Sequence, residues 1–305
     1  MDIYFAGTPN SAAEILKSLA SNDLFNIKGV ITQPDKKGKR GNKRIESPVS
    51  LMANSLNLQT YKPHNLTKTQ IQNDIDITNA DILLVVAYGN LIPTWILESN
   101  IKAINIHFSL LPRYRGASPI QSSLLNNDKK TGVTFMQMSK DLDAGKVIKC
   151  FEVPINKNDN KSSLEKKLTK LSILNLEKVI TDFYSNKTIP VDQEHKKASY
   201  CKKILKKDSI INFEEGAEKI FAKFRAYNEW PGICFIHKNK VIKIHGVEIT
   251  SNKSPGNPGD IISFNKSGLT LKTIDYDIVI THLQFPNKNI ITAKDAYNSY
   301  RQFFV

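Results

Sequence analysis

The first half of the chain alternates between apolar runs typical of buried strands and amphipathic stretches typical of helices. Helices are expected over residues 12–20, 47–56 and 118–126, with Asn10 or Ser11 capping the first, and Ser47 capping the second ahead of Pro48. Strands are expected at DIYFAG (2–7), IKGVITQ (27–33), DILLVVAY (81–88), INIHF (104–108), GVTFMQM (132–138) and KVIKCFEVPI (146–155). This order predicts an α/β fold with a doubly wound, mostly parallel open sheet.

The second half changes character after one more amphipathic helix, expected over residues 162–185. Residues 186–207 are polar and strongly basic, and we interpret them as a linker. From residue 208 the pattern predicts a small β-barrel of the OB-like type, with one helix at AEKIFAKFRAY (217–227). Its strand-like runs are SIINF (209–213), CFIHKNKVIKIHGVEI (234–249), GLTLKTI (268–274) and DIVITHLQF (277–285). The predicted domains are therefore residues 1–185 and 208–305.

The strand at 104–108 carries polar side chains at alternate positions. Because successive side chains of a strand point to opposite faces, Ile104, Ile106 and Phe108 can enter a core while Asn105 and His107 share the other face. Ligands of open α/β sheets bind beyond the carboxyl ends of the strands. The strand therefore delivers an amide and an imidazole to the edge where a site is expected.

A third polar side chain, Asp143, lies in the glycine-containing turn of MSKDLDAGKVI, between two predicted strands. An amide, an imidazole and a carboxylate suit acyl transfer: Asn105 can donate a hydrogen bond to an oxyanion, and His107 can exchange protons near neutral pH. Asp143 can orient the imidazole or hold a water that relays a proton. Spacing alone leaves a second reading open, in which Asn105 caps a loop, His107 is a core histidine and Asp143 is an ordinary turn residue.

Composition narrows the class of protein. With 305 residues, 40% hydrophobic and 24% charged, the chain is expected to be globular, and it lacks the run of about 18 apolar residues that a membrane helix requires. Three scattered cysteines and no ligand-spaced histidines predict a metal-free protein of a reducing cytoplasm. The first turn, AGTPNSAAE, lacks the glycine fingerprint of a nicotinamide-binding fold, and no phosphate-binding loop motif occurs.

Positive charge is concentrated in two segments of a chain whose formal net charge is +14. Each segment on its own could be an ordinary solvated surface. Two basic patches beside a domain with candidate catalytic residues nevertheless favour a nucleic-acid substrate. The first patch, in QPDKKGKRGNKRIESP, contains Lys36, Lys37, Lys39, Arg40, Lys43 and Arg44. The second contains Lys196, Lys197, Lys202, Lys203, Lys206 and Lys207.

Taken together, these motifs make the chain resemble the methionyl-tRNA formyltransferase family from end to end. The matching stretches are FAGTP, VITQPD, VVAYGNLIP, INIHFSLLPRYRGASPIQ, TGVTFMQM, LDAGKVI and RAYNEWPG. The resemblance implies a Rossmann-like formyltransferase domain and an OB-like domain that helps to hold tRNA. It also implies transfer of a formyl group from 10-formyltetrahydrofolate to the α-amino group of methionyl-initiator tRNA. An amino-sugar nucleotide is the alternative acceptor, since related formyltransferases share the central block.

The resemblance also assigns residues. Asn105, His107 and Asp143 match the catalytic set, and Arg40 aligns with the arginine that checks the unpaired end of the initiator tRNA. The loop around Arg40 departs from the family, because lysines stand where the family often has Arg-Pro-Ala. We expect a monomer that needs no metal and does not bind a membrane. The matches to the folate-binding segments are Ser109, Leu110, Leu111, Pro112, Val86, Ala87, Tyr88 and Gly89.

Overall fold

The computed structural model describes residues 1–38, 44–66 and 77–305. The chain divides into two compact units. Unit 1 comprises Met1–Pro119, Lys130–Pro154 and Glu165–Lys202, and unit 2 comprises Ile120–Lys129, Ile155–Leu164 and Lys203–Val305. Most of the segment interpreted as a linker, residues 186–202, is therefore grouped with unit 1. The domain boundaries drawn from the sequence stay a prediction.

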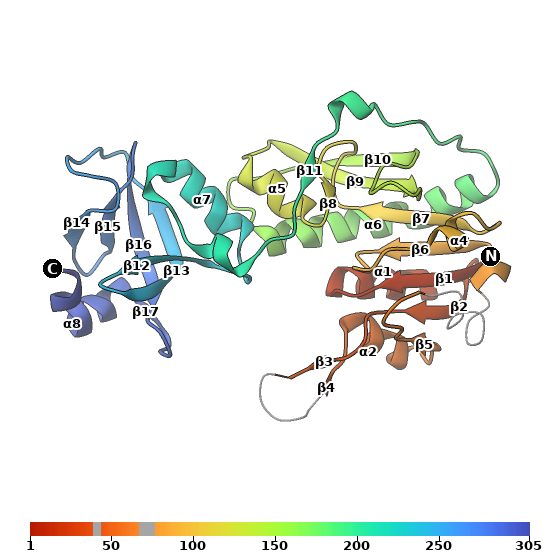
Figure 1. Cartoon of the computed structure of the whole chain (residues 1–305), viewed down its shortest axis with the longest axis horizontal. Helices are drawn as coiled ribbons and strands as arrows, with labels where there is room; N and C mark the ends of the chain where they lie inside the picture. The colour runs from red at the N-terminus through yellow and green to blue at the C-terminus, as the bar shows by residue number, and fades with distance from the viewer. Residues whose placement is uncertain (39–43, 67–76) are drawn as a thin grey trace. The chain divides into compact units, whose positions relative to one another are not determined.

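Unit 1 is built on a seven-stranded sheet with the strand order β10-β9-β7-β6-β1-β2-β5 (Figure 1). Strands β1, β2, β5, β6 and β7 run parallel to their neighbours, whereas β9 and β10 are antiparallel. The predicted mostly parallel open sheet is thus confirmed. The strands are β1 (Asp2–Gly7), β2 (Asn26–Ile31), β5 (Thr60–Tyr61), β6 (Ile82–Val86), β7 (Lys102–His107), β9 (Lys130–Gln137) and β10 (Val147–Pro154).

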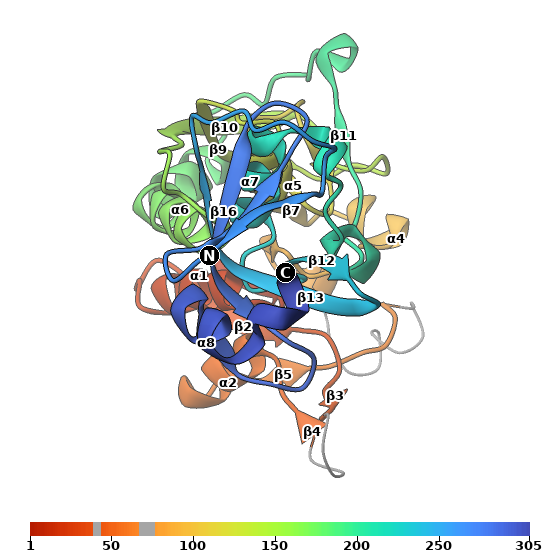
Figure 2. The ribbon, with the colours of Figure 1, turned by 90° about the vertical axis from the view of Figure 1, so that its left-hand side faces the viewer.

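Helices lie on both faces of this sheet (Figure 2). The helices α1 (Asn10–Ala20), α2 (Pro48–Ser55) and α6 (Lys161–Tyr184) cover one face, and the short α4 (Thr94–Leu97) lies on the other. Side-chain hydrogen bonds join α6 to α1, from Ser11 to Glu165 at 2.8 Å, and to the turn after α1, from Asn22 to Glu177 at 2.7 Å. Because both faces are covered, all five residues of β6 are buried, as its continuous apolar run predicts.

The two predicted helix caps have different outcomes. Ser47 caps α2 as expected, since its hydroxyl accepts a hydrogen bond from the backbone N–H of Ser50 at 3.0 Å and Pro48 is the first helical residue. The prediction for α1 is wrong, because Pro9 is the N-cap residue and no side chain caps the helix. Asn10 is already helical, and the Ser11 hydroxyl donates to Glu165 of α6 instead.

Two short strand pairs of unit 1 are not evident from the sequence. One joins β3 (Lys36–Lys37) to β4 (Arg44–Ile45) and is antiparallel. The other joins β8 (Arg115–Gly116) to β11 (Tyr200–Cys201) and is parallel. Each strand has only two residues, too few to produce a periodic pattern.

Unit 2 contains an antiparallel sheet of the OB-like type, as predicted, in the order β12-β13-β16-β15-β14, with β17 paired to β16. Helix α7 packs against β13, and the C-terminal helix α8 packs against β14, β16 and β17 (Figure 2). Helix α5 (Pro119–Leu125) also belongs almost entirely to this unit. The other elements are β12 (Ile233–His237), β13 (Lys240–Ile249), β14 (Ile261–Phe264), β15 (Leu269–Lys272), β16 (Asp277–Gln284), β17 (Ile290–Thr292), α7 (Ala217–Ala226) and α8 (Ala293–Phe304).

Two strand predictions for unit 2 need correction. The run at 234–249 is not one strand but a hairpin, because Lys238 and Asn239 adopt positive φ angles of 44° and 61° and turn the chain between β12 and β13. The strand predicted at 209–213 is wrong, because 3-10 turns lie at both ends of this segment and Ile210 makes only an isolated bridge to Cys234. Helix α8, which no prediction included, buries Ala293, Ala296 and Phe304 against the sheet.

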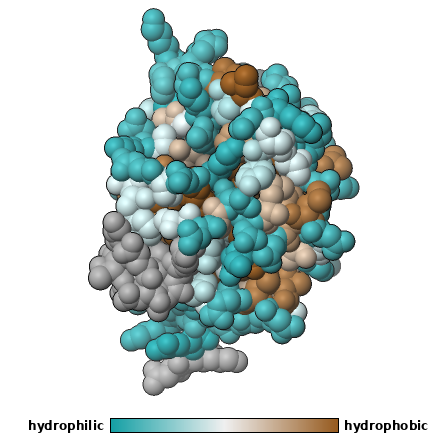
Figure 3. Space-filling model, turned by 90° about the vertical axis from the view of Figure 1, so that its right-hand side faces the viewer, coloured by the Kyte–Doolittle hydropathy of each residue, from teal (hydrophilic) through white to brown (hydrophobic). Residues whose placement is uncertain are grey.

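The described part of the chain contains no helix that is both long and apolar enough to cross a membrane. The face of the molecule in Figure 3 is covered mainly by hydrophilic side chains, and its hydrophobic side chains form separate patches. Among the same described residues, no group of three or more His, Cys, Asp or Glu side chains is arranged to hold a metal ion.

Candidate active site

Strand β7 places Asn105 and His107 on one face of the sheet, as the alternation predicts. The residues of the opposite face, Ile104 and Ile106, are 0% and 3% exposed, and Phe108 follows them into the core at 8%. The strand lies between β6, its parallel neighbour, and β9, its antiparallel neighbour. Its carboxyl end therefore opens at the position where a ligand of an α/β sheet is expected.

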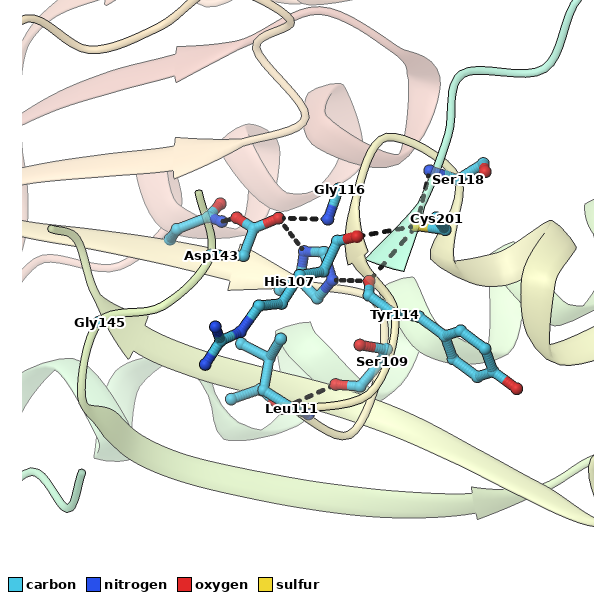
Figure 4. Close-up of polar contacts among 12 residues, drawn as sticks. His107, Ser109, Leu111, Tyr114, Gly116, Ser118, Asp143, Gly145 and Cys201 are labelled. Atoms are coloured by element: carbon cyan, nitrogen blue, oxygen red, sulfur yellow. Dashed lines mark hydrogen bonds and ion pairs between the residues drawn. The ribbon is translucent and has the colours of Figure 1, made fainter. Parts of the chain in front are cut away.

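The Asp143 carboxylate contacts both of these side chains, and Figure 4 shows it beside His107. Asn105 Nδ2 donates to Asp143 Oδ1 at 3.4 Å, and His107 Nδ1 is 3.7 Å from Asp143 Oδ2. The backbone N–H of Gly116 also donates to Oδ2, at 2.7 Å. Asp143 has a φ of 48°, a left-handed conformation in the turn before β10 that aims its side chain at β7. The structure thus brings together the three residues that the sequence singled out.

The orientation of the His107 ring is fixed from its other side. Its Nε2 atom lies 2.8 Å from the carbonyl oxygen of Tyr114, and the side chain is buried. A carbonyl oxygen can only accept a hydrogen bond, so Nε2 carries a proton and donates it. The ring nitrogen that remains for proton exchange is Nδ1, on the side of Asp143.

The loop that follows β7 contains the predicted folate residues Ser109, Leu110, Leu111 and Pro112. Ser109 is fully buried and its hydroxyl donates to the carbonyl of Arg113 at 2.6 Å, whereas the next three residues are partly exposed. Thr134 of β9 ties the loop down by donating to the Ser109 carbonyl at 2.7 Å and accepting from the Leu111 N–H at 3.1 Å. These bonds hold the exposed part of the loop beside the end of β7.

The second predicted folate segment, Val86 to Gly89, follows β6. Val86 and Tyr88 are buried, while Ala87 and Gly89 are exposed and have positive φ angles of 47° and 89°. Burial raises the pKa of the Tyr88 hydroxyl, which therefore stays protonated at neutral pH. Gly89 lies on the wall of a hollow of about 660 Å³, which is also lined by Asn65, Leu66, Asn90, Leu91, Pro93 and Trp95.

The predicted tRNA residues divide between described and undescribed parts of the chain. Lys36 and Lys37 of β3 and Arg44 of β4 are exposed on one short hairpin. Lys39, Arg40 and Lys43 lie outside the described residues. The lysines of the second patch that we predict to bind tRNA are all exposed: Lys202, Lys203, Lys206 and Lys207.

The base of the β3–β4 hairpin is held by an ion-pair cluster that sequence patterns did not reveal. Lys62 Nζ lies 2.8 Å from Asp35 Oδ1 and 3.0 Å from Glu46 Oε2, so one ammonium joins the two ends of the basic loop. Burial opposes the charge of Lys62, but its hydrogen bonds to both carboxylates outweigh that effect and raise its pKa. Hydrogen bonds from Ser50 and Lys62 lower the pKa of Glu46.

Sequence reasoning also missed the segment that supports the active-site loop. Ser199 accepts from the Arg115 N–H through its carbonyl at 2.8 Å and from the Tyr114 N–H through its hydroxyl at 3.0 Å. The buried Cys201 thiol donates to the carbonyls of Tyr114 and Arg115 (Figure 4). The basic character of residues 186–207 favoured their interpretation as a linker. Nothing in the local sequence indicates that Ser199 and Cys201 hydrogen-bond to the backbone of the active-site loop.

Comparison with known proteins places this geometry in a family. Residues 1–180 match the family described as Formyl transferase, and residues 203–301 match its C-terminal domain. Over 308 aligned residues the chain is 39% identical to a methionyl-tRNA formyltransferase from Buchnera aphidicola subsp. Acyrthosiphon pisum (strain Tuc7), with 100% of this chain and 97% of the relative covered. A relative with the same description from strain 5A has the same identity and coverage.

Solved structures at lower identity share the fold. An N-formyltransferase from Helicobacter canadensis, in complex with folinic acid and dTDP-3-aminofucose, has a TM-score of 0.68 at 20% identity, covering 93% of this chain and 99% of its own. HypX from Aquifex aeolicus, in complex with tetrahydrofolic acid, has a TM-score of 0.62 at 13% identity. The alignment covers 97% of this chain but only 46% of HypX. The chain therefore belongs to the formyl transferase family, and the two relatives from Buchnera aphidicola that match it over its whole length are methionyl-tRNA formyltransferases.

Proposed function

We propose that this protein transfers the formyl group of 10-formyltetrahydrofolate to the α-amino group of methionyl-initiator tRNA, which supplies formylmethionyl-tRNA for translation initiation in the cytoplasm. The observation that carries the proposal is the grouping of Asn105, His107 and Asp143 at the carboxyl end of β7. It is supported by the family membership and by relatives of the same length that carry this description.

The chemistry follows from the three side chains. The amine nitrogen attacks the formyl carbon, and the carbonyl oxygen becomes an oxyanion to which Asn105 Nδ2 donates a hydrogen bond. His107, held through Nε2 by the Tyr114 carbonyl, supplies positive charge and exchanges a proton through Nδ1. Asp143 stabilises the charged imidazole and accepts the proton that the amine loses. The bond from the formyl carbon to the folate nitrogen then breaks, and that nitrogen takes up the proton that Asp143 accepted, so that tetrahydrofolate leaves and the carboxylate is restored.

The folate is assigned to the two loops at the carboxyl ends of β6 and β7. Val86 to Gly89 would form a wall for the pteridine, beside the hollow that Gly89 lines. Ser109 to Pro112 would bind it from the neighbouring strand, on a loop that Thr134 holds in place. Both loops adjoin the strand that carries Asn105, so a bound formyl donor reaches the catalytic groups.

The tRNA is assigned to the two basic patches. The exposed Lys36, Lys37 and Arg44 stand on a hairpin whose base is closed by Lys62, and we include Lys39, Arg40 and Lys43 of the same loop from the sequence. Lysine side chains at these positions would meet phosphates and make affinity depend on salt. We further propose that residues 186–207 and the domain at 208–305 contribute contacts, among them from Lys202, Lys203, Lys206 and Lys207.

The test is a comparison of acceptors at a fixed 10-formyltetrahydrofolate concentration. Purified protein is given methionyl-initiator tRNA, methionyl-elongator tRNA or a dTDP-linked amino sugar, and formylated product is measured. We expect turnover on the initiator tRNA far above that on the other two. Preferential turnover of the amino sugar would instead support the alternative acceptor, which the fold alone also permits.

A further inference from the structure

Arg115 is a buried arginine directly beside the active site. Its side chain belongs to β8 and is only 2% exposed. The guanidinium donates to the amide oxygen of Gln193, at 2.6 Å from Nη2 and 3.1 Å from Nε. It also lies 3.4 Å from the Tyr200 hydroxyl and 3.3 Å from His195 Nδ1. A buried cation is costly unless its donors are satisfied, so these hydrogen-bond partners keep the guanidinium in one position.

Gln193 connects this arginine to the turn that carries Asp143. Its side-chain nitrogen donates to the carbonyl oxygens of Asp143 at 2.9 Å and Gly145 at 2.7 Å. The amide orientation is unambiguous, because a guanidinium only donates and carbonyls only accept. The residue is 6% exposed, and both donors and both acceptor sites of its amide are used.

The same turn is held a second time from β8. The N–H of Gly116, the residue after Arg115, donates to Asp143 Oδ2 at 2.7 Å. The Arg115 side chain thus fixes the backbone of the turn through Gln193, while the neighbouring N–H fixes the carboxylate. Asp143 has a left-handed φ of 48°, a conformation that persists where surrounding contacts determine it.

We propose that Gln193 is a positioning residue, which transmits the fixed position of Arg115 to the Asp143 turn and so sets the distance between the carboxylate and His107. This inference rests on the proposed function, in which Asp143 acts on the imidazole. Gln193 touches no reacting atom in this scheme. Its loss therefore lowers kcat and leaves the KM values for both substrates nearly unchanged.

The sharpest variant is Gln193→Glu. A carboxylate of the same size keeps, and strengthens, the bonds from Arg115, but it presents an oxygen to two carbonyl oxygens where the amide presented N–H groups. If Gln193 positions the turn, kcat falls roughly tenfold or more, since small displacements of a catalytic group are costly. If the residue only satisfies Arg115, Gln193→Glu has wild-type kcat, and the proposal is overturned.

Controls separate positioning from charge and from stability. Leu174→Glu adds a carboxylate on α6, outside the segments assigned to folate or tRNA, at a side chain that is 79% exposed, and it should keep the wild-type kcat and KM. The folding of Gln193→Glu is checked by circular dichroism and thermal unfolding. If Gln193→Glu does not fold, Arg115→Lys is measured instead. This variant keeps the positive charge but loses the paired hydrogen bonds from the guanidinium to Gln193, and kcat should again fall without a change in KM.

The last arm tests whether Gln193 acts through Asp143. In an Asp143→Asn background, adding Gln193→Glu should change kcat by less than about twofold. The reason is that the effects of two substitutions do not add when one residue acts through the other. A further loss as large as in the wild-type background would overturn the positioning role. If Asp143→Asn alone kept wild-type turnover, the catalytic assignment of the proposed function would fail instead, so the two failures are distinguishable.

Discussion

Asp143 Oδ2 lies 3.7 Å from His107 Nδ1, and the two side chains are 13% and 7% exposed. This pairing joins the end of a strand to a turn that is distant in the sequence, and it places the Nδ1 atom of the imidazole beside the carboxylate. Because Nε2 is engaged by the Tyr114 carbonyl, proton exchange at Nδ1 runs beside the carboxylate. The neighbouring Asn105 amide completes the set.

The first prediction concerns the oxyanion donor. Asn105→Ala removes the only amide of the set, and we expect kcat to fall on the order of 10²–10³-fold, as for the loss of one oxyanion donor. His107→Ala should be at least as severe, because it removes both the charge and the proton exchange. Steady-state formylation measures both, with Asn126→Ala as a control at an exposed amide. A variant that keeps more than about a third of wild-type turnover would remove that residue from the mechanism.

The second prediction concerns the folate loop after β6. Gly89 has a φ of 89°, and a Cβ atom there would approach Gln33 Nε2 to 2.5 Å. The Gln33 side chain can move, so the lasting effect of Gly89→Ala is a strained backbone that shifts the loop. We expect the KM for 10-formyltetrahydrofolate to rise several-fold while the KM for tRNA stays nearly constant.

Gly232→Ala provides the matched control for that measurement. Gly232 has a φ of 76°, so alanine there strains the backbone to a comparable degree, and no atom lies within 4 Å of where its Cβ would be. The residue lies in unit 2, whereas the folate loop lies in unit 1. Its folate KM should equal that of the wild type. Equal changes in both variants would mean that the effect comes from lost stability rather than from the folate loop.

The strands of unit 1 could be predicted from the sequence because their signals are local. The continuous apolar run of β6 reflects burial on both faces of the strand. The alternation of apolar and polar residues around Asn105 reflects a strand with one face in the core. The three candidate catalytic residues were found by the same reasoning, together with the family motifs. Asp143 was the hardest to place, because its position depends on a turn whose conformation does not follow from composition.

The supporting contacts could not be predicted, and the reason is physical. Gln193 lies in a basic, polar segment, and nothing local indicates that its amide is buried between a guanidinium and two carbonyls. The predicted cap of α1 is wrong because the Ser11 hydroxyl donates to a carboxylate of α6, distant in the sequence, and no side chain caps the start of the helix. Such partners are set by tertiary packing, which local propensity does not contain.

The third prediction concerns the pH dependence of stability at the base of the basic hairpin. The pKa of Glu46 is lowered from its ordinary value of 4.5 by hydrogen bonds from Ser50 and Lys62. A lowered folded-state pKa stabilises the fold above the ordinary value, and the contribution is lost as the pH falls through the folded value. Glu46→Gln should therefore lower Tm by roughly 1–3 °C near neutral pH, and the deficit should shrink in acid.

Thermal unfolding of the two proteins from about pH 7 down to about pH 3.5 measures this difference. Lys140→Gln, which breaks the exposed pair of Lys140 with Glu98, serves as a control outside the hairpin. A deficit for Glu46→Gln that is constant over the whole range would show that the carboxylate contributes by packing and not through its charge.

The last prediction concerns Arg40, which lies outside the described residues and is assigned from the sequence. Its loop is basic throughout, and the lysines should meet phosphates, so that their removal lowers affinity evenly and flattens its salt dependence. A guanidinium offers several donors in fixed directions, whereas an ammonium is a point charge. We therefore expect Arg40→Ala to lower kcat/KM on methionyl-initiator tRNA far more than Lys36→Ala or Lys37→Ala, which change exposed residues of β3.

Arg40→Lys makes the test specific, because it keeps the charge and removes the directed donors. It should still be impaired on the initiator tRNA. If Arg40 acts at the unpaired end of the acceptor arm, its variants should also lose discrimination against an initiator tRNA whose first acceptor pair is restored. Measuring kcat/KM on both tRNAs at two salt concentrations separates the effects. Equal, modest losses for Arg40→Ala and the two lysine variants would mean that this loop contributes only nonspecific attraction to the tRNA backbone.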